Sequence, residues 1–161
     1  MSNLHHLFNP RGIAVVGASP GADRAGGQTL IALKHYQYPG GVYPVNPRYP
    51  DILGFKCYAS VKDVPQPCDV AVIALPAKQV IDMVAECGKN GIRHAVVLGG
   101  GFREAGPEGV ELEAKLLAAS REYNVRLIGP NCLGLVNIHA NVYAAFGSIS
   151  KPPTLKAGGV S

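Results

Sequence analysis

The chain of 161 residues contains no tryptophan, and only 16% of its residues are charged. Its lysines and arginines are scattered and no aromatic pair alternates along a strand, which argues against an RNA- or DNA-binding surface. No apolar run reaches the roughly 18 residues of a transmembrane helix, and residues 1–6 lack the basic and apolar regions of a signal peptide. We therefore expect a cytoplasmic protein that binds neither nucleic acid nor a membrane.

Cysteine pairs with the spacing of metal-binding motifs are also absent. The four cysteines are widely separated, so the sequence predicts neither a zinc site nor a disulfide framework. We expect reduced, partly buried thiols at Cys57, Cys68, Cys87 and Cys132. Surface or helix-cap positions are expected for all five histidines, which are His5, His6, His35, His94 and His139.

Short apolar segments alternate with amphipathic ones along the chain, of which 47% is hydrophobic. The apolar segments predict five strands over residues 13–16, 42–45, 70–75, 95–98 and 125–128. Helical spacing relates two further sets of residues, the first being Val80, Met83, Val84 and Cys87 and the second Leu112, Leu116, Ala119 and Tyr123. Gly91 and Asn124 stand where these two helices should end.

This alternation predicts a single domain over residues 1–161 with a Rossmann-like α/β fold. In such a doubly wound fold, helices cover both faces of a mainly parallel sheet. Ligands then bind in the loops that follow the carboxyl ends of the strands. Glycine or proline follows three of the predicted strands, in the segments 75–77, 99–102 and 129–134. One such loop is explained by a tight turn, but their recurrence favours a shared ligand cleft.

The segment from Arg11 to Gly27 runs from an apolar strand through a glycine-rich turn into the start of a helix. Such a turn presents several backbone N–H groups beside the positive end of a helix dipole, where a phosphate group can bind. A small polyanionic ligand would also recruit arginines near the loop tips, and the candidates are Arg24, Arg48 and Arg103. The sequence thus favours a nucleotide-like ligand.

NAD fits this turn poorly. Ser19 replaces the second glycine of Gly-x-Gly-x-x-Gly, and the second strand ends in Asn46, Pro47 and Arg48 where an acidic residue would bind a ribose hydroxyl. This neutral and basic tip suits a ribose that carries its own phosphate, as in NADP or coenzyme A.

A hydrolase is a third interpretation, because residues 17–21 match Gly-x-Ser-x-Gly. That elbow needs upstream strands with an oxyanion-hole loop and a helix that begins at once. Here only a dozen residues precede the strand, and Pro20 and six further loop residues delay the helix.

Four motifs occur in order at residues 10–19, 43–47, 52–54 and 129–134. Together they closely resemble the N-terminal CoA-binding domain of the NDP-forming acyl-CoA synthetases. That superfamily includes ADP-forming acetate–CoA ligase and the succinyl-CoA synthetase alpha subunit, and bacterial protein lysine acetyltransferases that carry the same domain form a related arm. The resemblance extends over residues 4–161.

The resemblance implies a role for each matching loop. The first turn would hold CoA phosphates through Gly17, Ser19, Gly21 and Arg24, with Gly26 and Gly27 at the helix start. The second strand would approach the ribose phosphate or adenine through Asn46, Pro47 and Arg48. The adenine side is implied for Leu75 and Pro76, and the pantetheine and thiol end for Gly100, Gly101 and Asn131. The shorter, threonine-containing turn of succinyl-CoA synthetase is not kept, so the hydroxyl of Ser19 inherits no defined role.

The resemblance also implies which parts of the reaction lie elsewhere. In the family a phosphorylated histidine in a second domain carries the chemistry, and an ATP-grasp module exchanges its phosphate with ATP and ADP. No histidine of this chain occupies such a place, and Cys132 has no neighbouring histidine or carboxylate in sequence to activate it. We therefore expect a fragment of a longer synthetase that binds CoA but does not ligate, with residues 158–161 leading into the second domain.

The partners implied are CoA, downstream synthetase domains or an ATP-grasp subunit, and self-association into a homo-oligomer is compatible with the sequence. Two alternatives retain CoA as ligand, namely a free-standing regulatory protein and the CoA-binding part of a lysine acetyltransferase. An NADP-binding reductase domain is the remaining one.

Overall fold

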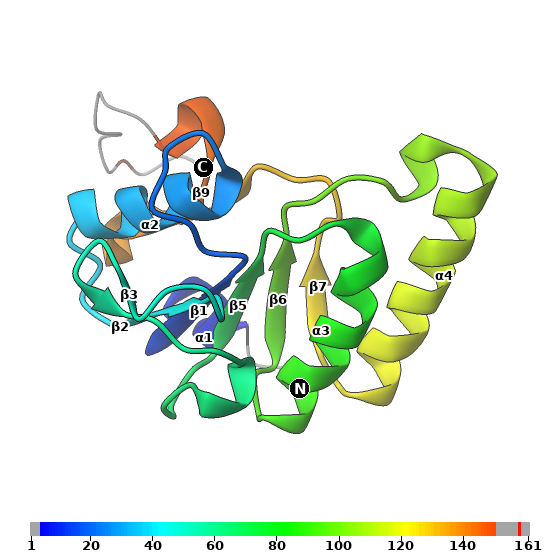
Figure 1. Cartoon of the computed structure of the whole chain (residues 1–161), viewed down its shortest axis with the longest axis horizontal. Coiled ribbons are helices and arrows are strands. Elements are labelled where there is room, and N and C mark those ends of the chain that lie inside the picture. The colour runs from blue at the N-terminus through cyan, green and yellow to red at the C-terminus, as the bar shows by residue number, and fades with distance from the viewer. Residues whose placement is uncertain (1–3, 151–157, 159–161) are drawn as a thin grey trace.

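The computed structural model describes residues 4–150 and 158 of the chain. Its centre is a parallel sheet of five strands in the order β2-β1-β5-β6-β7 (Figure 1). These strands are β1 (Gly12–Val16), β2 (Gly41–Val45), β5 (Val70–Ile73), β6 (His94–Val97) and β7 (Arg126–Ile128). The chain passes from β1 outward to β2 and then returns across β1 to β5. This reversal places the topological switch point between β1 and β5.

Burial explains why these segments are strands. Every residue of β1, β5 and β6 is buried, as expected for apolar runs that are covered on both faces of a parallel sheet. The two edge strands, β2 and β7, are only partly buried. Pro44 stands in β2, where an edge strand tolerates the missing N–H group. The five predicted strands are confirmed, although β5 ends at Ile73 and β6 begins one residue earlier than predicted.

Three long helices connect the strands: α2 (Ala25–His35), α3 (Ala77–Lys89) and α4 (Pro107–Glu122). The predicted apolar faces are confirmed, because Val80, Val84 and Cys87 of α3 and Leu116 of α4 are fully buried. Gly91 and Asn124 follow the last turns of α3 and α4 with φ angles of 82° and 53°, respectively. Both helices therefore end through the left-handed conformation, as the sequence predicts.

Side chains of the sheet alternate between two hydrophobic layers. Ala14 and Val16 join the layer beneath α3 and α4, which lie side by side in Figure 1. Ile13 and Val15 point to the opposite layer, which contains Leu30 of α2 and Leu7 of the short helix α1 (His5–Phe8). Helices thus cover both faces of the sheet, which confirms the predicted doubly wound architecture.

Two antiparallel hairpins were not predicted. The first joins β3 (Asp51–Ile52) to β4 (Phe55–Lys56), and the second joins β8 (Gly134–Asn137) to β9 (Val142–Ala145). Strand β9 packs against α2, where the ring of Tyr143 stacks on Tyr36 with centroids 3.6 Å apart. Four short 3₁₀ helices complete the described chain: η1 (Val61–Asp63), η2 (Arg103–Ala105), η3 (Ile138–Ala140) and η4 (Gly147–Ser150). The segment 158–161, which we expect to lead into a second domain, lies outside the described residues except for residue 158.

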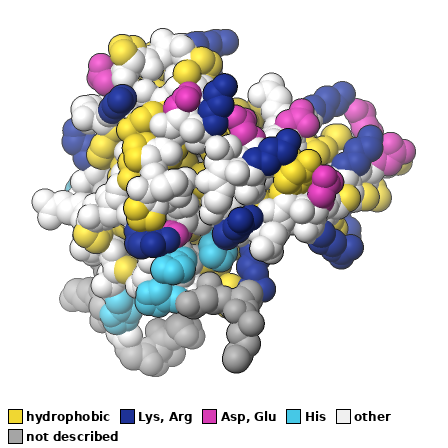
Figure 2. Space-filling model, turned by 90° about the horizontal axis from the view of Figure 1, so that it is seen from below, with side chains coloured by type: hydrophobic (Ala, Val, Ile, Leu, Met, Phe, Trp, Pro, Cys, Tyr) yellow, Lys and Arg dark blue, Asp and Glu magenta, His cyan; other side chains and the backbone are white. Residues whose placement is uncertain are grey.

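The expectation of a surface or capping position was wrong for His94. This residue begins the central strand β6 and is only 5% exposed, because parallel neighbours and connecting loops cover even the start of the strand. Its Nδ1 atom lies 3.3 Å from the carbonyl oxygen of Asp69. Seen from below, the end of the molecule at which the sheet strands begin shows several histidines beside lysine or arginine side chains (Figure 2).

The four cysteines are free thiols, as predicted, and three of them are more deeply buried than expected. Burial raises the pKa of Cys68 to about 12 and also raises the pKa of Cys57, Cys87 and Cys132. These thiols are therefore protonated at neutral pH. Among the described residues, no helix combines the length and the apolar character that crossing a membrane requires.

Candidate functional site

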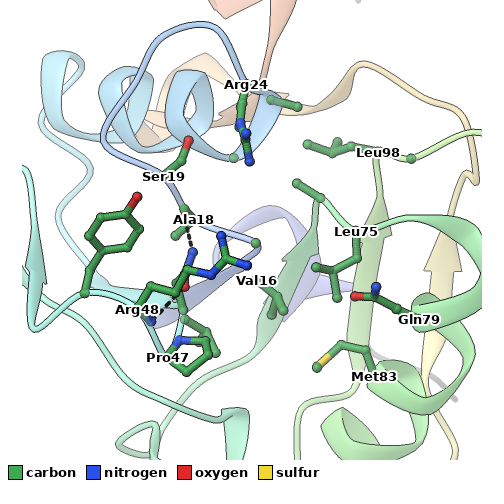
Figure 3. Close-up of a pocket in the computed structure, with 18 of the residues that line it drawn as sticks. Val16, Ala18, Ser19, Arg24, Pro47, Arg48, Leu75, Gln79, Met83 and Leu98 are labelled. Carbon is green, nitrogen blue, oxygen red and sulfur yellow. Dashed lines mark hydrogen bonds between the residues drawn. The ribbon is translucent and has the colours of Figure 1, made fainter.

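A cavity of about 970 Å³ opens outside the carboxyl ends of β1, β2, β5 and β6. It lies at the switch point, the place where doubly wound sheets bind their ligands. Ten of the fourteen predicted site residues line it: Gly17, Ser19, Gly21, Arg24, Gly26, Asn46, Pro47, Arg48, Leu75 and Pro76. Loops distant in sequence therefore meet around one cavity (Figure 3).

The loop after β1 is held tightly against its neighbours by glycine. Gly17 adopts a φ angle of 79°, and a Cβ atom there would lie 2.4 Å from the carbonyl oxygen of Ala74. At Gly27 a Cβ atom would lie 1.9 Å from the carbonyl oxygen of Gly21. Gly27 does not line the cavity; its small size lets the loop fold over the first turn of α2. Gly26 lines the cavity and also packs closely, because a Cβ atom there would lie against the Gly17 carbonyl oxygen.

The amino end of α2 faces this cavity without a cap of its own. The N-cap residue Arg24 makes no capping side-chain hydrogen bond, and the first turn contains no acidic residue. Among the described residues, the N–H groups of Ser19, Gly21 and Gly26 have no hydrogen-bond acceptor. Several donors and the helix dipole are thus available to an anion at this point.

Asn46 connects the tip of β2 to the glycine-rich loop. Its Nδ2 group donates to the carbonyl oxygen of Ala18 at 2.7 Å, and its Oδ1 atom accepts from the N–H of Arg48 at 3.0 Å. The amide therefore orients both the loop and the backbone of Arg48. The guanidinium of Arg48 extends into the cavity in Figure 3. Within the described part of the chain, it forms no ion pair.

Two acidic residues also line the cavity, and both have partners. Asp23 lies 3.9 Å from the Nε atom of Arg24, where both side chains are about three-quarters exposed, so their attraction is weak. Glu86 accepts a 2.6 Å hydrogen bond from the hydroxyl group of Ser60. Neither carboxylate caps the amino end of α2.

The wall opposite the glycine-rich loop is mainly apolar. Leu75 follows β5 and Leu98 follows β6, and Met83 lies on α3 on the Leu75 side of the cavity (Figure 3). The sequence reasoning missed Met83 together with Gln79 and Glu86 of the same helix. Their spacing of three and four residues was a usable signal, because it places all three on one face of a helix that begins at the site. Tyr49 and Ser60 were missed as well, and no motif marked them.

Three predicted residues, Gly100, Gly101 and Asn131, lie near one another but do not line the cavity. The N–H of Asn131 donates to the carbonyl oxygen of Gly99 at 3.0 Å, which joins the loops after β6 and β7. The carboxylate of Glu104 accepts from the N–H groups of Gly101 and Phe102 at 2.6 and 3.2 Å. These loops extend the same edge of the sheet beyond the cavity.

Two further sequence candidates are explained by other contacts. Arg103 does not line the cavity, and its Nε atom donates to Glu113 at 2.7 Å. The thiol of Cys132 is half-buried and donates to the carbonyl oxygen of Val97 at 3.4 Å. Because burial raises its pKa, this thiol is not an activated nucleophile.

Comparison with known proteins identifies close relatives. The chain is 44% identical, over 92% of its length, to the alpha subunit of acetate–CoA ligase [ADP-forming] II from Pyrococcus furiosus. It is 43% identical, over 91% of its length, to acetate–CoA ligase [ADP-forming] I from Archaeoglobus fulgidus. The chain spans only 32% and 21% of those two relatives, respectively.

A solved structure agrees with the sequence relatives. The fold matches the dinucleotide forming acetyl-coenzyme A synthetase 1 of Ca. Korarchaeum cryptofilum, which was solved with phosphate and ADP, with a TM-score of 0.87 and 43% identity. This match covers 92% of the present chain and 32% of the synthetase chain. The family described as CoA binding domain matches residues 11–138, which contain the five parallel strands and the cavity. The chain belongs to this CoA binding domain family.

Proposed function

We propose that the chain binds coenzyme A in the cavity at the switch point, as the CoA-binding part of an ADP-forming acyl-CoA synthetase. One observation carries the proposal: the amino end of α2 and the guanidinium of Arg48, which have no capping side chain and no ion-pair partner among the described residues, line the same cavity. Coenzyme A carries a diphosphate and a separate 3′-phosphate. It therefore offers one anionic group to each of these two positive sites.

Placing the two anionic groups in this way determines where the other parts of CoA lie. The diphosphate lies against the N–H groups of the loop that contains Gly17, Ser19 and Gly21, with Arg24 at its rim. The 3′-phosphate lies against Arg48 beyond Pro47. The adenine packs on Leu75, Pro76 and Met83, whose side chains form the apolar wall. The pantetheine arm then extends along the sheet edge toward Gly100, Gly101 and Asn131.

The same geometry argues against the other ligands considered. An NAD ribose needs an acidic acceptor at the end of β2. Here Asn46 stands at that place, and its side-chain amide is already hydrogen-bonded to Ala18 and Arg48. A hydrolase needs an activated serine, whereas the Ser19 hydroxyl group is nearly buried and donates to the carbonyl oxygen of Gly21 at 3.4 Å. NADP remains a competitor, because Arg48 could bind its 2′-phosphate.

In the complete enzyme we propose a reaction in which a carboxylic acid, CoA and ATP give an acyl-CoA, ADP and inorganic phosphate through a phosphohistidine outside this chain. Within this reaction the present residues bind CoA and orient its thiol. The partners are further synthetase domains or an ATP-grasp subunit, and the relatives are three to five times longer than the matched segment. The free thiols agree with a cytoplasmic location.

Calorimetric titration of the 161-residue chain with CoA, dephospho-CoA, NADP and NAD tests the proposal. We expect CoA to bind most tightly. NAD has no separate phosphate for Arg48, and NADP, which has one, needs the dinucleotide turn whose second glycine is replaced here by Ser19. Dephospho-CoA should bind more weakly, and NAD should bind weakest. NADP binding as tight as that of CoA would overturn the proposal in favour of a reductase domain.

A further inference from the structure

A second groove, of about 610 Å³, lies at the other side of the sheet along the edge strand β7. It is formed by residues of α1, α4 and β7 and contains none of the residues that line the coenzyme cavity. Its location is therefore independent of the proposed CoA site. We infer that this groove binds an extended, acidic and apolar segment of a protein partner, which adds as a strand beside β7.

The backbone of β7 is open for such pairing. The N–H of Arg126 donates to the carbonyl oxygen of Arg93 at 2.8 Å, so this group faces β6. Because successive backbone groups of a strand point to opposite sides, the N–H and C=O of Leu127 face away from β6 and into the groove. In the described part of the chain, no strand pairs with this outer edge.

Both sides of the edge present apolar side chains. Toward α4 the groove contains Leu117, which is 42% exposed, and Leu127. Toward α1 it contains Leu4, which is 46% exposed, and Leu7 and Ile128. Side chains of an added strand alternate between these two sides, so each side offers leucine or isoleucine contacts to every second residue.

The charges of the groove select an acidic partner. Arg121 lies on the α4 side, and Arg126 lies on the α1 side because it shares a strand face with Ile128. Neither forms an ion pair among the described residues, and no acidic residue lines the groove. Carboxylates on both faces of an added strand would therefore each meet one arginine.

The same charges disfavour a second copy of this chain as the occupant. Pairing of β7 with β7 of another copy would bring four arginines together at an interface whose lining contains no carboxylate. Like charges that face one another cost free energy, and the net charge of +4 adds to this repulsion.

The test uses the 161-residue chain labelled with ¹⁵N and the peptide acetyl-EVVEEVVE-amide, in which both strand faces carry glutamate and valine. We expect NMR shift changes confined to residues 4–7 and 117–128 and at least tenfold slower hydrogen exchange at the Leu127 amide. The same peptide with lysine in place of glutamate should leave the spectrum unchanged.

Charge-reversal substitutions test whether the peptide binds in this groove. Arg121→Glu and Arg126→Glu should each weaken peptide binding about fivefold, whereas Lys115→Glu makes the same charge change at an exposed position of α4 outside the groove and should have little effect. All three positions are exposed, so circular dichroism should show unchanged folding. The inference is overturned if the peptide does not bind, if Lys115→Glu weakens binding equally, or if sedimentation shows a dimer that Arg126→Glu dissociates.

Discussion

The side-chain amide of Asn46 donates to the carbonyl oxygen of Ala18 at 2.7 Å, and this bond joins the ends of the two neighbouring strands β1 and β2. The two residues are 28 positions apart in sequence. Their contact fixes the glycine-rich loop relative to Arg48, so the two positive sites of the cavity keep a constant separation. Asn46 therefore acts as a positioning residue for the proposed CoA site.

Replacement of Asn46 by alanine removes its hydrogen bonds to Ala18 and Arg48 and should weaken CoA binding by about 1 kcal/mol, the usual contribution of a hydrogen bond, for the bond that holds the loop. The substitution moves the whole loop and does not remove one particular phosphate contact. CoA and dephospho-CoA should therefore lose similar affinity in calorimetric titrations. Asn46→Asp keeps an acceptor for the Arg48 N–H but cannot donate to Ala18 and adds negative charge, so it should weaken binding further. An Asn46→Asp variant with unchanged affinity would contradict the positioning role.

Arg48→Ala should weaken CoA by roughly 1 to 3 kcal/mol, the scale of a hydrogen bond that involves a charged group. Dephospho-CoA should be nearly unaffected, because it lacks the 3′-phosphate assigned to this arginine. Arg103→Ala is the matched control, since Arg103 lies outside the cavity and bonds to Glu113. Equal losses for CoA and dephospho-CoA would show that Arg48 acts on another part of the ligand.

Gly27→Ala should destabilise the fold by roughly 1 to 3 kcal/mol, as overpacking of a tight contact does. The added methyl group would press on the backbone carbonyl of Gly21, which cannot rotate away as a side chain can. CoA affinity should also fall because the loop must move. Gly91→Asn is the control: its φ angle of 82° carries some backbone strain, which asparagine bears better than most residues, and nothing lies within 4 Å of a Cβ atom there, so it should cost less than Gly27→Ala. Chemical denaturation of both variants measures their free energies of unfolding.

His94 should make stability depend on pH. Burial lowers the pKa of His94 below its ordinary value of 6.5, more strongly than its contact with Asp69 raises it. The unfolded chain therefore takes up a proton near pH 6.5 while the folded chain does not, and stability falls as the pH drops from about 6.5 through the lowered pKa. In the His94→Asn variant, the midpoint of thermal unfolding should depend less on pH over that range. The exposed His139→Asn should leave the slope unchanged, and equal slopes in all three proteins would refute the assignment.

The 161-residue chain given acetate, CoA and ATP should form no acetyl-CoA, although it binds CoA. Thioester formation requires an activated acyl phosphate, and the sequence contains no Walker-type phosphate loop. A coupled assay for thioester and for ADP measures this outcome. Turnover that survives replacement of all five histidines by alanine would overturn both the fragment hypothesis and the proposed phosphohistidine route.

The sequence predicted the central sheet well because its strands carry an unbroken apolar signal. Residues 13–16 and 70–73 are β-branched or small and are buried on both faces, so their pattern depends little on context. The β3-β4 hairpin escaped prediction because its strands are two residues long and its turn uses Leu53 and Gly54, with φ angles of 56° and 83°, in place of the usual Asn-Gly.

Site residues were predictable where the backbone itself forms the site. The glycine-rich loop and the β2 tip carry local signals, and their candidates line the cavity. Gly27 needed the folded structure, since only the close approach of Gly21 shows that its smallness serves packing. The cavity-lining side chains of α3 share one helix face, and this spacing points to the site only once the start of the helix is known to lie there.

The stacking of Tyr36 on Tyr143 extends the packed unit beyond the residues that match the CoA binding domain. The match to the CoA binding domain ends at residue 138, whereas β9, which carries Tyr143, begins at residue 142. Strand β9 covers the face of α2 that carries Ala32 and the C-cap residue Tyr36, and α2 supplies the amino end that faces the cavity. A polypeptide trimmed to residues 11–138 would lack β9 and expose the face of α2 that carries Tyr36, so we expect the smallest autonomous binding unit to extend through Ala145.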